Sequence, residues 1–204
     1  MDTYNFYKNN GWVHLKNQIS YEIVDELRNR SIKLKKWLNG KIGQPSDYGA
    51  TVHWPGLGCA GMYDDYLMDF YKSKFMVNLA SKFLDTNDIW MYNDQVVVKE
   101  PHKGFSFDIH TDNTAGGAPN KGKNTINFCV ILDTFTDANG GLQIKDTKVY
   151  PKAGDIVAIH GDTPHQSGVN KSWKPRCLYA CVYSDEQIIF QNYYKTLINT
   201  NSLI

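Results

Sequence analysis

The sequence lacks several features that would narrow its function at once. No apolar run approaches the roughly 18 residues of a membrane-spanning helix, and the first residues (MDTYN) do not start like a signal peptide. The 22 basic and 21 acidic residues leave a net charge of +1, so nothing biases the chain towards nucleic acid or anionic lipid. From these absences we expect a protein of the cytoplasm with no nucleic-acid partner and no membrane partner.

Cysteine is scarce, and its spacing fits no common zinc site. The 4 cysteines include no CxxC pair, and Cys129, Cys177 and Cys181 lie in apolar runs that are typical of strands. We therefore expect reduced, mostly buried thiols and no disulfide framework. Cys177 and Cys181 are an even number of residues apart, so they should share one face of a strand, most simply the buried face.

The length and composition of the chain favour one ordered domain. A chain of 204 residues with 42% hydrophobic and 13% aromatic residues can bury a core of its own, and no repeat or linker divides it. We expect a single domain over residues 1–204, in which residues 1–88 form a mainly helical cover with a lid loop. Residues 89–185 would form a barrel core, and residues 186–204 a C-terminal tail.

The first part of the chain carries helical patterns. A strand is expected at residues 12–15, and Ser20 is a suitable N-cap for an amphipathic helix over residues 21–38 that ends near Gly40. Apolar residues at three- and four-residue intervals predict a second amphipathic helix over residues 64–84. These helices would cover one face of a sheet.

A long loop separates the two helices. Residues 41–62 are rich in glycine, proline and aromatic residues, and a loop of this length in a compact domain is often a lid or a binding segment. The alternative is an ordered surface loop whose Trp54 fills the core. His53 lies beside Trp54 and would close over the site if the loop is a lid. Near the other end of the chain, residues 191–197 read as a short helix.

The second part of the chain is a series of short strands separated by turn residues. Two helices followed by such a series predict a jelly roll, or β-sandwich, with the helices packed outside it. The expected strands are residues 89–92 and 95–99 (one strand or a kinked pair), 105–112, 125–132, 141–144, 148–149, 155–160 and 176–183.

Three residues in the strand-rich half form a candidate metal site. In an extended chain His110 and Asp112 point to the same side, and His165 downstream offers a third donor. Two histidines and one carboxylate occupy one face of a metal and leave positions open, which suits non-haem Fe(II) chemistry with O2 and a chelating co-substrate. Zinc hydrolases use the same residue types, so the ligands alone do not identify the metal.

An arginine downstream favours the iron interpretation. Arg176 follows His165 by 176 − 165 = 11 residues and opens the next expected strand. Its guanidinium is a planar fork for a carboxylate and stays charged in a partly dry pocket. This arrangement suits 2-oxoglutarate, whose 2-oxo acid end would chelate the metal while its other carboxylate pairs with Arg176. Ser167, on the same strand face as His165, would add a hydroxyl donor.

Motifs along the chain, read together, resemble those of one known family. Their order and spacing are similar to those of the phytanoyl-CoA dioxygenase family of Fe(II)/2-oxoglutarate oxygenases. They are His110-Thr111-Asp112, Asn139-Gly140-Gly141-Leu142, Ala153-Gly154-Asp155, residues 165–170 (HQSGVN) and Arg176; in addition, Lys99-Glu100-Pro101 resembles the Lys-Pro-Pro segment of the family, and residues 6–15 its usual opening.

The resemblance implies a fold and an activity. The fold would be a double-stranded β-helix with iron at one end and 2-oxoglutarate behind it. The activity would use O2 and 2-oxoglutarate to hydroxylate an unactivated C–H bond of a small molecule, with release of succinate and CO2. The stretch between Leu142 and Ala153 is short for the family, so this member is trimmed. Related halogenases replace the metal carboxylate with a small residue, so Asp112 favours hydroxylation.

Further residues are candidates for the pocket, and two other functions stay open. Lys99 and Asn127 are expected at the co-substrate with Arg176 and Ser167, and Gln95, Trp54 and His53 at the substrate. One alternative is a cupin-like metal-dependent hydrolase or isomerase, for which Arg176 would have no co-substrate to hold. The other is a jelly-roll binding module without catalysis.

Overall fold

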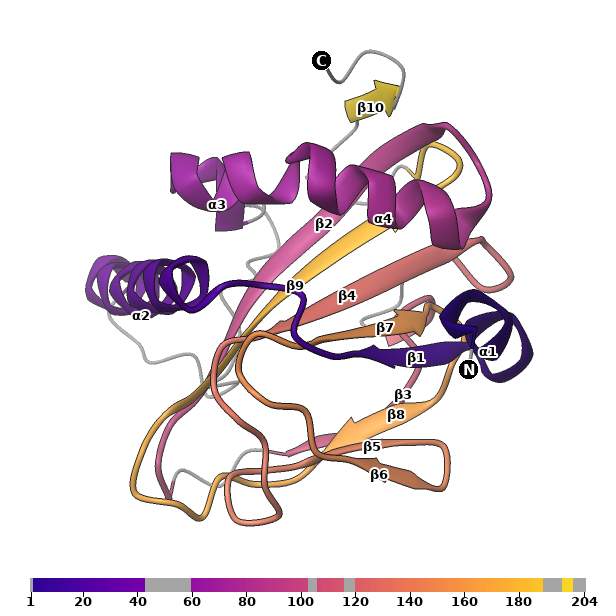
Figure 1. Ribbon diagram of the computed structural model, residues 1–204. Helices are drawn as coiled ribbons and strands as arrows, with labels where there is room; N and C mark the ends of the chain where they lie inside the picture. The colour runs from indigo at the N-terminus through magenta and orange to yellow at the C-terminus, as the bar shows by residue number, and fades with distance from the viewer. Residues whose placement is uncertain (1, 43–59, 103–105, 116–119, 189–195, 200–204) are drawn as a thin grey trace.

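The computed structural model describes residues 2–42, 60–102, 106–115, 120–188 and 196–199 (Figure 1). Its helices are α1 (Thr3–Asn10), α2 (Tyr21–Ile42), the 3-10 helix η1 (Ala60–Met62), α3 (Asp65–Tyr71) and α4 (Lys74–Leu84). Its strands are β1 (Trp12–Leu15), β2 (Asp88–Lys99), β3 (Phe107–His110), β4 (Thr125–Ile131), β5 (Leu142–Ile144), β6 (Thr147–Val149), β7 (Ile156–His160), β8 (His165–Ser167), β9 (Arg176–Ser184) and β10 (Thr196–Asn199). No helix in these ranges is long and apolar enough to cross a membrane.

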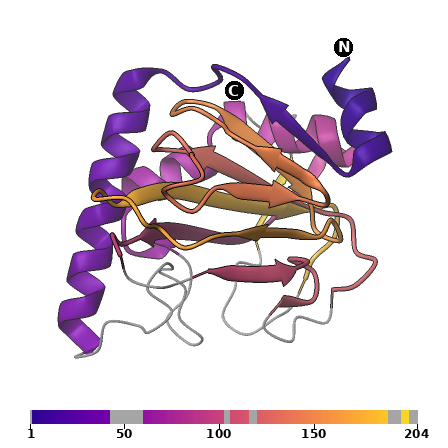
Figure 2. The same cartoon turned by 90° about the horizontal axis from the view of Figure 1, so that it is seen from below.

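Two antiparallel sheets form the centre of the fold. The larger sheet has the order β1-β7-β4-β9-β2-β10 and the smaller one the order β3-β8-β5-β6. Figure 1 shows α3 and α4 over one face of the larger sheet and the smaller sheet beneath its other face. In Figure 2, α2 runs across the strands at one end of the larger sheet. The predicted jelly roll with helices outside is confirmed.

The central strands of the larger sheet are buried on both faces. Every residue of β4 and of β9 is buried, because helices cover one face and the smaller sheet covers the other. In β4, Ile126, Phe128 and Val130 join the core under the helices, whereas Asn127 and Cys129 face the space between the sheets. One strand therefore contributes alternately to the core and to the interior of the barrel.

The cysteine prediction is confirmed for the described residues. Cys129, Cys177 and Cys181 are free and buried. Cys177 and Cys181 lie together in the core under the helices, as their even spacing predicted. Burial raises the pKa of the Cys129 thiol to about 12, so this thiol is protonated at neutral pH.

The helix predicted over residues 64–84 is two helices. Asp64 caps α3 by accepting from the backbone N–H groups of Tyr66 and Leu67, and Ser73 caps α4 by accepting from that of Met76. The apolar period continues across the break, which is why the pattern alone predicted one helix. Serine competes with the helix for backbone hydrogen bonds, and here its side chain starts the second helix.

The helix α2 is longer than predicted and buries a slightly different stripe. It runs to Ile42 rather than ending near Gly40. The apolar spacing of the sequence predicts that Ile23, Leu27 and Leu34 share one buried stripe. Leu27 and Leu34 are buried, but Val24 is buried in place of Ile23, which is 37% exposed. A rotation of one residue about the helix axis satisfies the same apolar spacing, so the sequence could not distinguish the two choices.

One strand prediction and one helix prediction also need correction. The strand expected at residues 105–112 is the shorter β3, and the helix expected at residues 191–197 is wrong at its end, where β10 pairs with the edge of β2. Residues 189–195 and 43–59 lie outside the described residues, and with them most of the expected lid. The strand β2 is continuous, with an irregularity between Met91 and Asn93 that agrees with the kinked pair.

Candidate metal and co-substrate site

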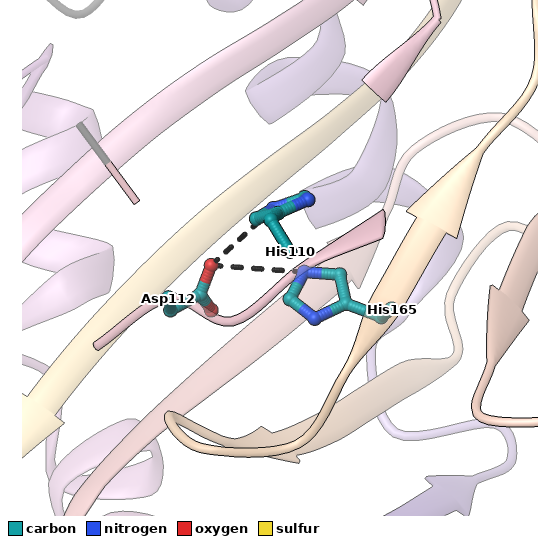
Figure 3. A group of neighbouring side chains, drawn as sticks. All are labelled: His110, Asp112 and His165. Atoms are coloured by element: carbon teal, nitrogen blue, oxygen red, sulfur yellow. Dashed lines mark ion pairs between the residues drawn. The ribbon is translucent and has the colours of Figure 1, made fainter. Parts of the chain in front are cut away.

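The three predicted metal ligands come together at the edge where β3 meets β8. His110 ends β3 and lies opposite His165, the first residue of β8, in an antiparallel pair. Asp112 was expected in the same strand, but it lies in the turn that follows β3. Its Oδ1 lies 3.8 Å from His110 Nε2 and 3.6 Å from His165 Nε2 (Figure 3). Among the described residues this is the cluster whose ligand atoms, all within 4.8 Å of one another, could hold a metal ion.

Both imidazole rings are oriented for metal binding. His110 Nδ1 lies 2.7 Å from the carbonyl oxygen of Asp108, and His165 Nδ1 lies 3.0 Å from that of Thr163. A carbonyl oxygen can only accept, so each Nδ1 carries a proton, and in the neutral form of the imidazole each Nε2 keeps its lone pair. Both lone pairs then point towards Asp112, as metal ligands require.

The carboxylate of Asp112 is fixed by a neighbour on the larger sheet. Asn127 Nδ2 donates to Asp112 Oδ2 over 2.9 Å, which leaves Oδ1 on the side of the two imidazoles. Asn127 was expected at the co-substrate, and it does line the cavity. Its hydrogen bond is to the carboxylate of Asp112, and partners of this kind commonly orient a carboxylate that binds a metal.

A buried asparagine that sequence analysis did not identify holds the turn after Asp112. The Asn113 side chain donates to Asp162 Oδ1 and to the Lys123 carbonyl and accepts from the Thr125 hydroxyl, and Asn113 N–H donates to the Gly161 carbonyl. A Cβ on Gly161 would lie 1.9 Å from Thr125 Oγ1, so only glycine fits there. Asn113 follows Asp112 directly, but its role depends on distant partners that no local pattern shows.

A cavity of about 150 Å³ between the two sheets contains the cluster. The predicted ligands lie in its wall together with Arg176, so both halves of the predicted site open into one space. The remaining lining residues are Tyr92, Asn93, Gln95, Val97, Phe107, Ala115, Asn127, Cys129, Phe135, Leu142, Gln166, Ser167, Leu178, Ala180 and Val182.

Arg176 is a buried cation with unused hydrogen-bonding capacity. Its side chain is 1% exposed, its guanidinium lies 4.2 Å from the ring centroid of Phe135, and Nη2 donates weakly to the Gly140 carbonyl over 3.4 Å. Burial lowers the pKa of Arg176 to about 10, so it is charged at neutral pH. Its Nε has no hydrogen-bond partner among the described residues. A buried cation of this kind fits an anionic ligand in the cavity.

Lys99 lies beside Arg176 but does not reach the cavity. The two residues are direct partners in the pairing of β2 with β9, and Lys99 is 2% exposed. Its Nζ donates to the Ser167 hydroxyl over 2.8 Å and to the carbonyls of Ser167 and Gly168. Burial and, secondly, the charge of Arg176 lower the pKa of Lys99 to about 7. Ser167 itself lines the cavity, so Lys99 approaches a bound ligand only through that hydroxyl.

One of the three predicted substrate residues lies at the site, and the other two lie outside the described residues. Gln95 lines the cavity from β2. His53 and Trp54 lie outside the described residues, so their place in a lid stays a prediction. Sequence analysis did not identify Tyr92 and Phe135, which also line the cavity, because an aromatic residue in a strand or turn is not by itself a signal of a site.

Comparison with known families gives one match. A family model described as "Phytanoyl-CoA dioxygenase (PhyH)" matches residues 7–145 of the chain, a span that includes His110 and Asp112 but ends before His165 and Arg176. No curated protein sequence matches the chain.

Solved structures of the same fold agree with this match. The epimerase SnoN in complex with Fe3+, alpha ketoglutarate and nogalamycin RO is 17% identical, with a TM-score of 0.73, over 93% of this chain and 84% of that chain. EvdO2 from Micromonospora carbonacea var. aurantiaca, complexed with 2-oxoglutarate, is also 17% identical, with a TM-score of 0.68, over 92% and 91%. The Ni complex of the non-heme monooxygenase ThoJ is 15% identical, with a TM-score of 0.71, over 98% and 80%.

Proposed function

The chain belongs to the phytanoyl-CoA dioxygenase family, and on that premise we propose that it is a non-haem Fe(II)- and 2-oxoglutarate-dependent dioxygenase. It hydroxylates an unactivated C–H bond of a small molecule and releases succinate and CO2. Iron, 2-oxoglutarate and O2 are the cofactor and co-substrates. SnoN and EvdO2, which share the fold, are complexed with alpha ketoglutarate and 2-oxoglutarate in their solved structures.

The observation that carries this proposal is the buried guanidinium of Arg176, whose Nε has no hydrogen-bond partner among the described residues, in the same cavity as the three-ligand cluster. A hydrolytic metal site needs only the ligands and a water. A buried arginine whose Nε faces no acceptor lowers the free energy of unfolding, unless a ligand supplies a carboxylate to which it can donate. A dicarboxylate that binds the metal at one end and Arg176 at the other satisfies both features.

Each residue has a defined task in the proposed mechanism. His110 Nε2, Asp112 Oδ1 and His165 Nε2 hold the metal, and Asn127 keeps the Asp112 carboxylate turned towards it. Arg176 holds the distal carboxylate of 2-oxoglutarate in a part of the barrel closed to water. When bound, iron would activate O2 with electrons from 2-oxoglutarate, which would be oxidised to succinate and CO2, and so make O2 able to attack the C–H bond.

The Ser167 hydroxyl adds orientation. Because Lys99 donates to Ser167 Oγ, the hydroxyl proton of Ser167 is directed away from Lys99 and is available to the same distal carboxylate. Two donors from different sheets, Ser167 on β8 and Arg176 on β9, fix the co-substrate along the barrel. This positioning is the contribution of the protein to the reaction.

Hydroxylation is the proposed outcome because Asp112 occupies the position that halogenases leave open. Other outcomes occur on this fold, since the similar structures include the epimerase SnoN and the carbocyclase SnoK. The mass of the product distinguishes them once a substrate is in hand. Hydroxylation adds one oxygen atom, epimerisation leaves the mass unchanged, and ring closure removes two hydrogen atoms.

Co-substrate binding tests the proposal. Anaerobic protein loaded with Fe(II) should develop a metal-to-ligand absorption band when 2-oxoglutarate is added. Arg176→Met should keep its metal and weaken 2-oxoglutarate binding by about 30-fold or more, because one partner of a buried charge pair is removed. His165→Ala should lose the band.

A matched control is Arg30→Met, which removes a partly exposed arginine that pairs with Glu26 far from the cavity and should leave binding unchanged. If wild-type protein shows no band, or if Arg176→Met and Arg30→Met bind 2-oxoglutarate equally well, the proposal is wrong. Turnover that needs neither O2 nor 2-oxoglutarate would instead support the metal-dependent hydrolase or isomerase.

A further inference from the structure

The strand register divides the cavity into two ends. On the larger sheet, Asn127, Val182 and Asn93 lie side by side across β4, β9 and β2, and Cys129, Ala180 and Gln95 form the next row. Further along β9 come Leu178 and Arg176. The Arg176 end is occupied by the co-substrate in the proposed function. The two rows named first therefore bound the space that is left for a substrate.

This remaining wall is uncharged in the part of the chain that the structure describes. The charged side chains that line the cavity are Asp112 and Arg176, with the titratable His110 and His165 beside them. All four are committed to the metal or to the co-substrate. A charged substrate group that entered between the sheets would lose its hydration without gaining a partner from this wall, which is costly.

One polar side chain in this wall is unengaged. Gln95 lines the cavity, and its side-chain amide has no hydrogen bond with any described residue. Its cross-strand neighbour is Ala180, whose small side chain leaves room in front of the amide. A free amide offers both a donor and an acceptor, so it fits a hydroxyl or carbonyl group.

The wall near Gln95 also contains an apolar patch. Tyr92 and Val182 line the cavity and pack with Ile188, and all three are buried. The Tyr92 hydroxyl accepts from Asn120 Nδ2 over 2.5 Å, which fixes the phenol ring. A ring or chain of carbon atoms would contact Tyr92 and Val182 without any polar group being left unpaired.

We propose that the substrate of this chain is an uncharged molecule that places an apolar ring or chain against Tyr92 and Val182 and a hydroxyl or carbonyl group at the Gln95 amide. The inference rests on the proposed function, because it takes the Arg176 end to be filled by 2-oxoglutarate. Gln95 is then the residue that selects the substrate, and a free amino acid is excluded at this position by the charges of its ammonium and carboxylate groups.

Four probes with the same ring test the inference. Benzyl alcohol and benzamide are neutral, benzoate is an anion, and benzylamine is a cation at neutral pH. Each is added at millimolar concentration to Ni(II)-loaded protein saturated with 2-oxoglutarate, and binding is measured by saturation-transfer NMR. Neutral probes should bind at least about tenfold more tightly than charged ones, because the charged ones lose hydration without compensation.

Variants identify the residue. Gln95→Leu should weaken the binding of benzyl alcohol and benzamide by roughly threefold to tenfold, the value of one hydrogen bond, without changing the Kd of 2-oxoglutarate. Gln143→Leu is the matched control, since Gln143 lies on β5 outside this cavity and its amide donates to the Lys145 carbonyl. It should change neither measurement.

The outcomes separate this inference from the proposed function. If benzoate or benzylamine binds as well as the neutral pair, if neither neutral probe binds, or if Gln95→Leu binds the neutral probes like wild type, the inference is wrong. An altered Kd of 2-oxoglutarate in Gln95→Leu would assign Gln95 to the co-substrate and also overturn it. Failure of 2-oxoglutarate to bind wild-type protein is measured first and concerns the proposed function alone.

Discussion

Replacing Lys99 by methionine tests the electrostatics at the deep end of the cavity. Lys99 lies directly opposite Arg176, and both are buried. Burial and then the charge of Arg176 lower the pKa of Lys99 from 10.5 to about 7. At about 1.4 kcal/mol per pKa unit, this change disfavours the charged form of Lys99 by about 5 kcal/mol relative to water.

The sign of the pH effect follows from this shift. Below pH 7 Lys99 is charged in both the folded and the unfolded chain, and the cost of burying its charge lowers the free energy of unfolding in full. Between pH 7 and 10.5 Lys99 is mostly neutral in the folded protein but charged in the unfolded chain, so this destabilisation is relieved as the pH rises. A carboxylate bound at Arg176 adds a negative charge nearby and raises the pKa of Lys99. Binding of 2-oxoglutarate above pH 7 should therefore take up a proton, and affinity should fall by up to about tenfold per pH unit.

Calorimetry measures the proton directly. Ni(II)-loaded protein is titrated with 2-oxoglutarate at pH values on both sides of 7, in phosphate and in Tris, whose ionisation enthalpies differ. Wild-type protein should show uptake of up to one proton, which increases above pH 7. Lys99→Met should bind without this uptake and with a flatter pH dependence, while the control Lys171→Met, an exposed lysine, should behave like wild type.

Two results would refute this reasoning. One is an apparent binding enthalpy that is the same in both buffers at every pH, which would mean that Lys99 keeps one protonation state throughout. The other is equal proton uptake by wild type and Lys99→Met, which would assign the proton to another group. Equal proton uptake together with a lower affinity of Lys99→Met would refute it as well and would assign the loss of affinity to the donor that Ser167 loses.

Three further predictions follow from the contacts. Asn127→Ala should weaken metal binding by about 10- to 100-fold in a competition with a chelator, because Asp112 loses its orienting partner. Phe128→Ala should lower the free energy of unfolding by about 3–5 kcal/mol in urea, because Phe128 is fully buried. Burial alone would raise the pKa of Asp155, but hydrogen bonds from two backbone N–H groups and from His14 hold it below 3.8. The free energy of unfolding should therefore decrease as the pH falls below about 4, and in Asp155→Asn this decrease should be absent from urea titrations at different pH values.

The fold could be predicted where pattern and burial coincide. The strands β4 and β9 were predicted because their apolar runs reflect burial on two faces, and the jelly roll followed from the number of such strands. The single helix over residues 64–84 failed because the break at Ser73 leaves the apolar period intact. The start of β10 was predicted to be helical because its strand conformation depends on the edge of β2, a distant partner.

The residues of the site could be predicted from the sequence, but the partners that each side chain contacts could not. His110, Asp112, His165 and Arg176 have side chains whose chemistry restricts their use, so type and order were enough to group them. Lys99 was predicted at the co-substrate, yet its Nζ donates to the hydroxyl and carbonyl of Ser167 in β8 and to the carbonyl of Gly168 just after it. Such a choice between partners depends on packing between sheets and has no signal in the sequence.

The alternation along β4 also separates stability from function at adjacent positions. Phe128 faces the helices and Asn127 faces the metal cluster, although the two are neighbours in the chain. Loss of the Phe128 ring should therefore reduce the free energy of unfolding but leave the metal affinity of the folded fraction unchanged, whereas loss of the Asn127 amide should do the reverse. If both variants changed both quantities together, the two faces of the strand would be coupled through the backbone of β4, and the assignment of one face to the core and the other to the site would fail.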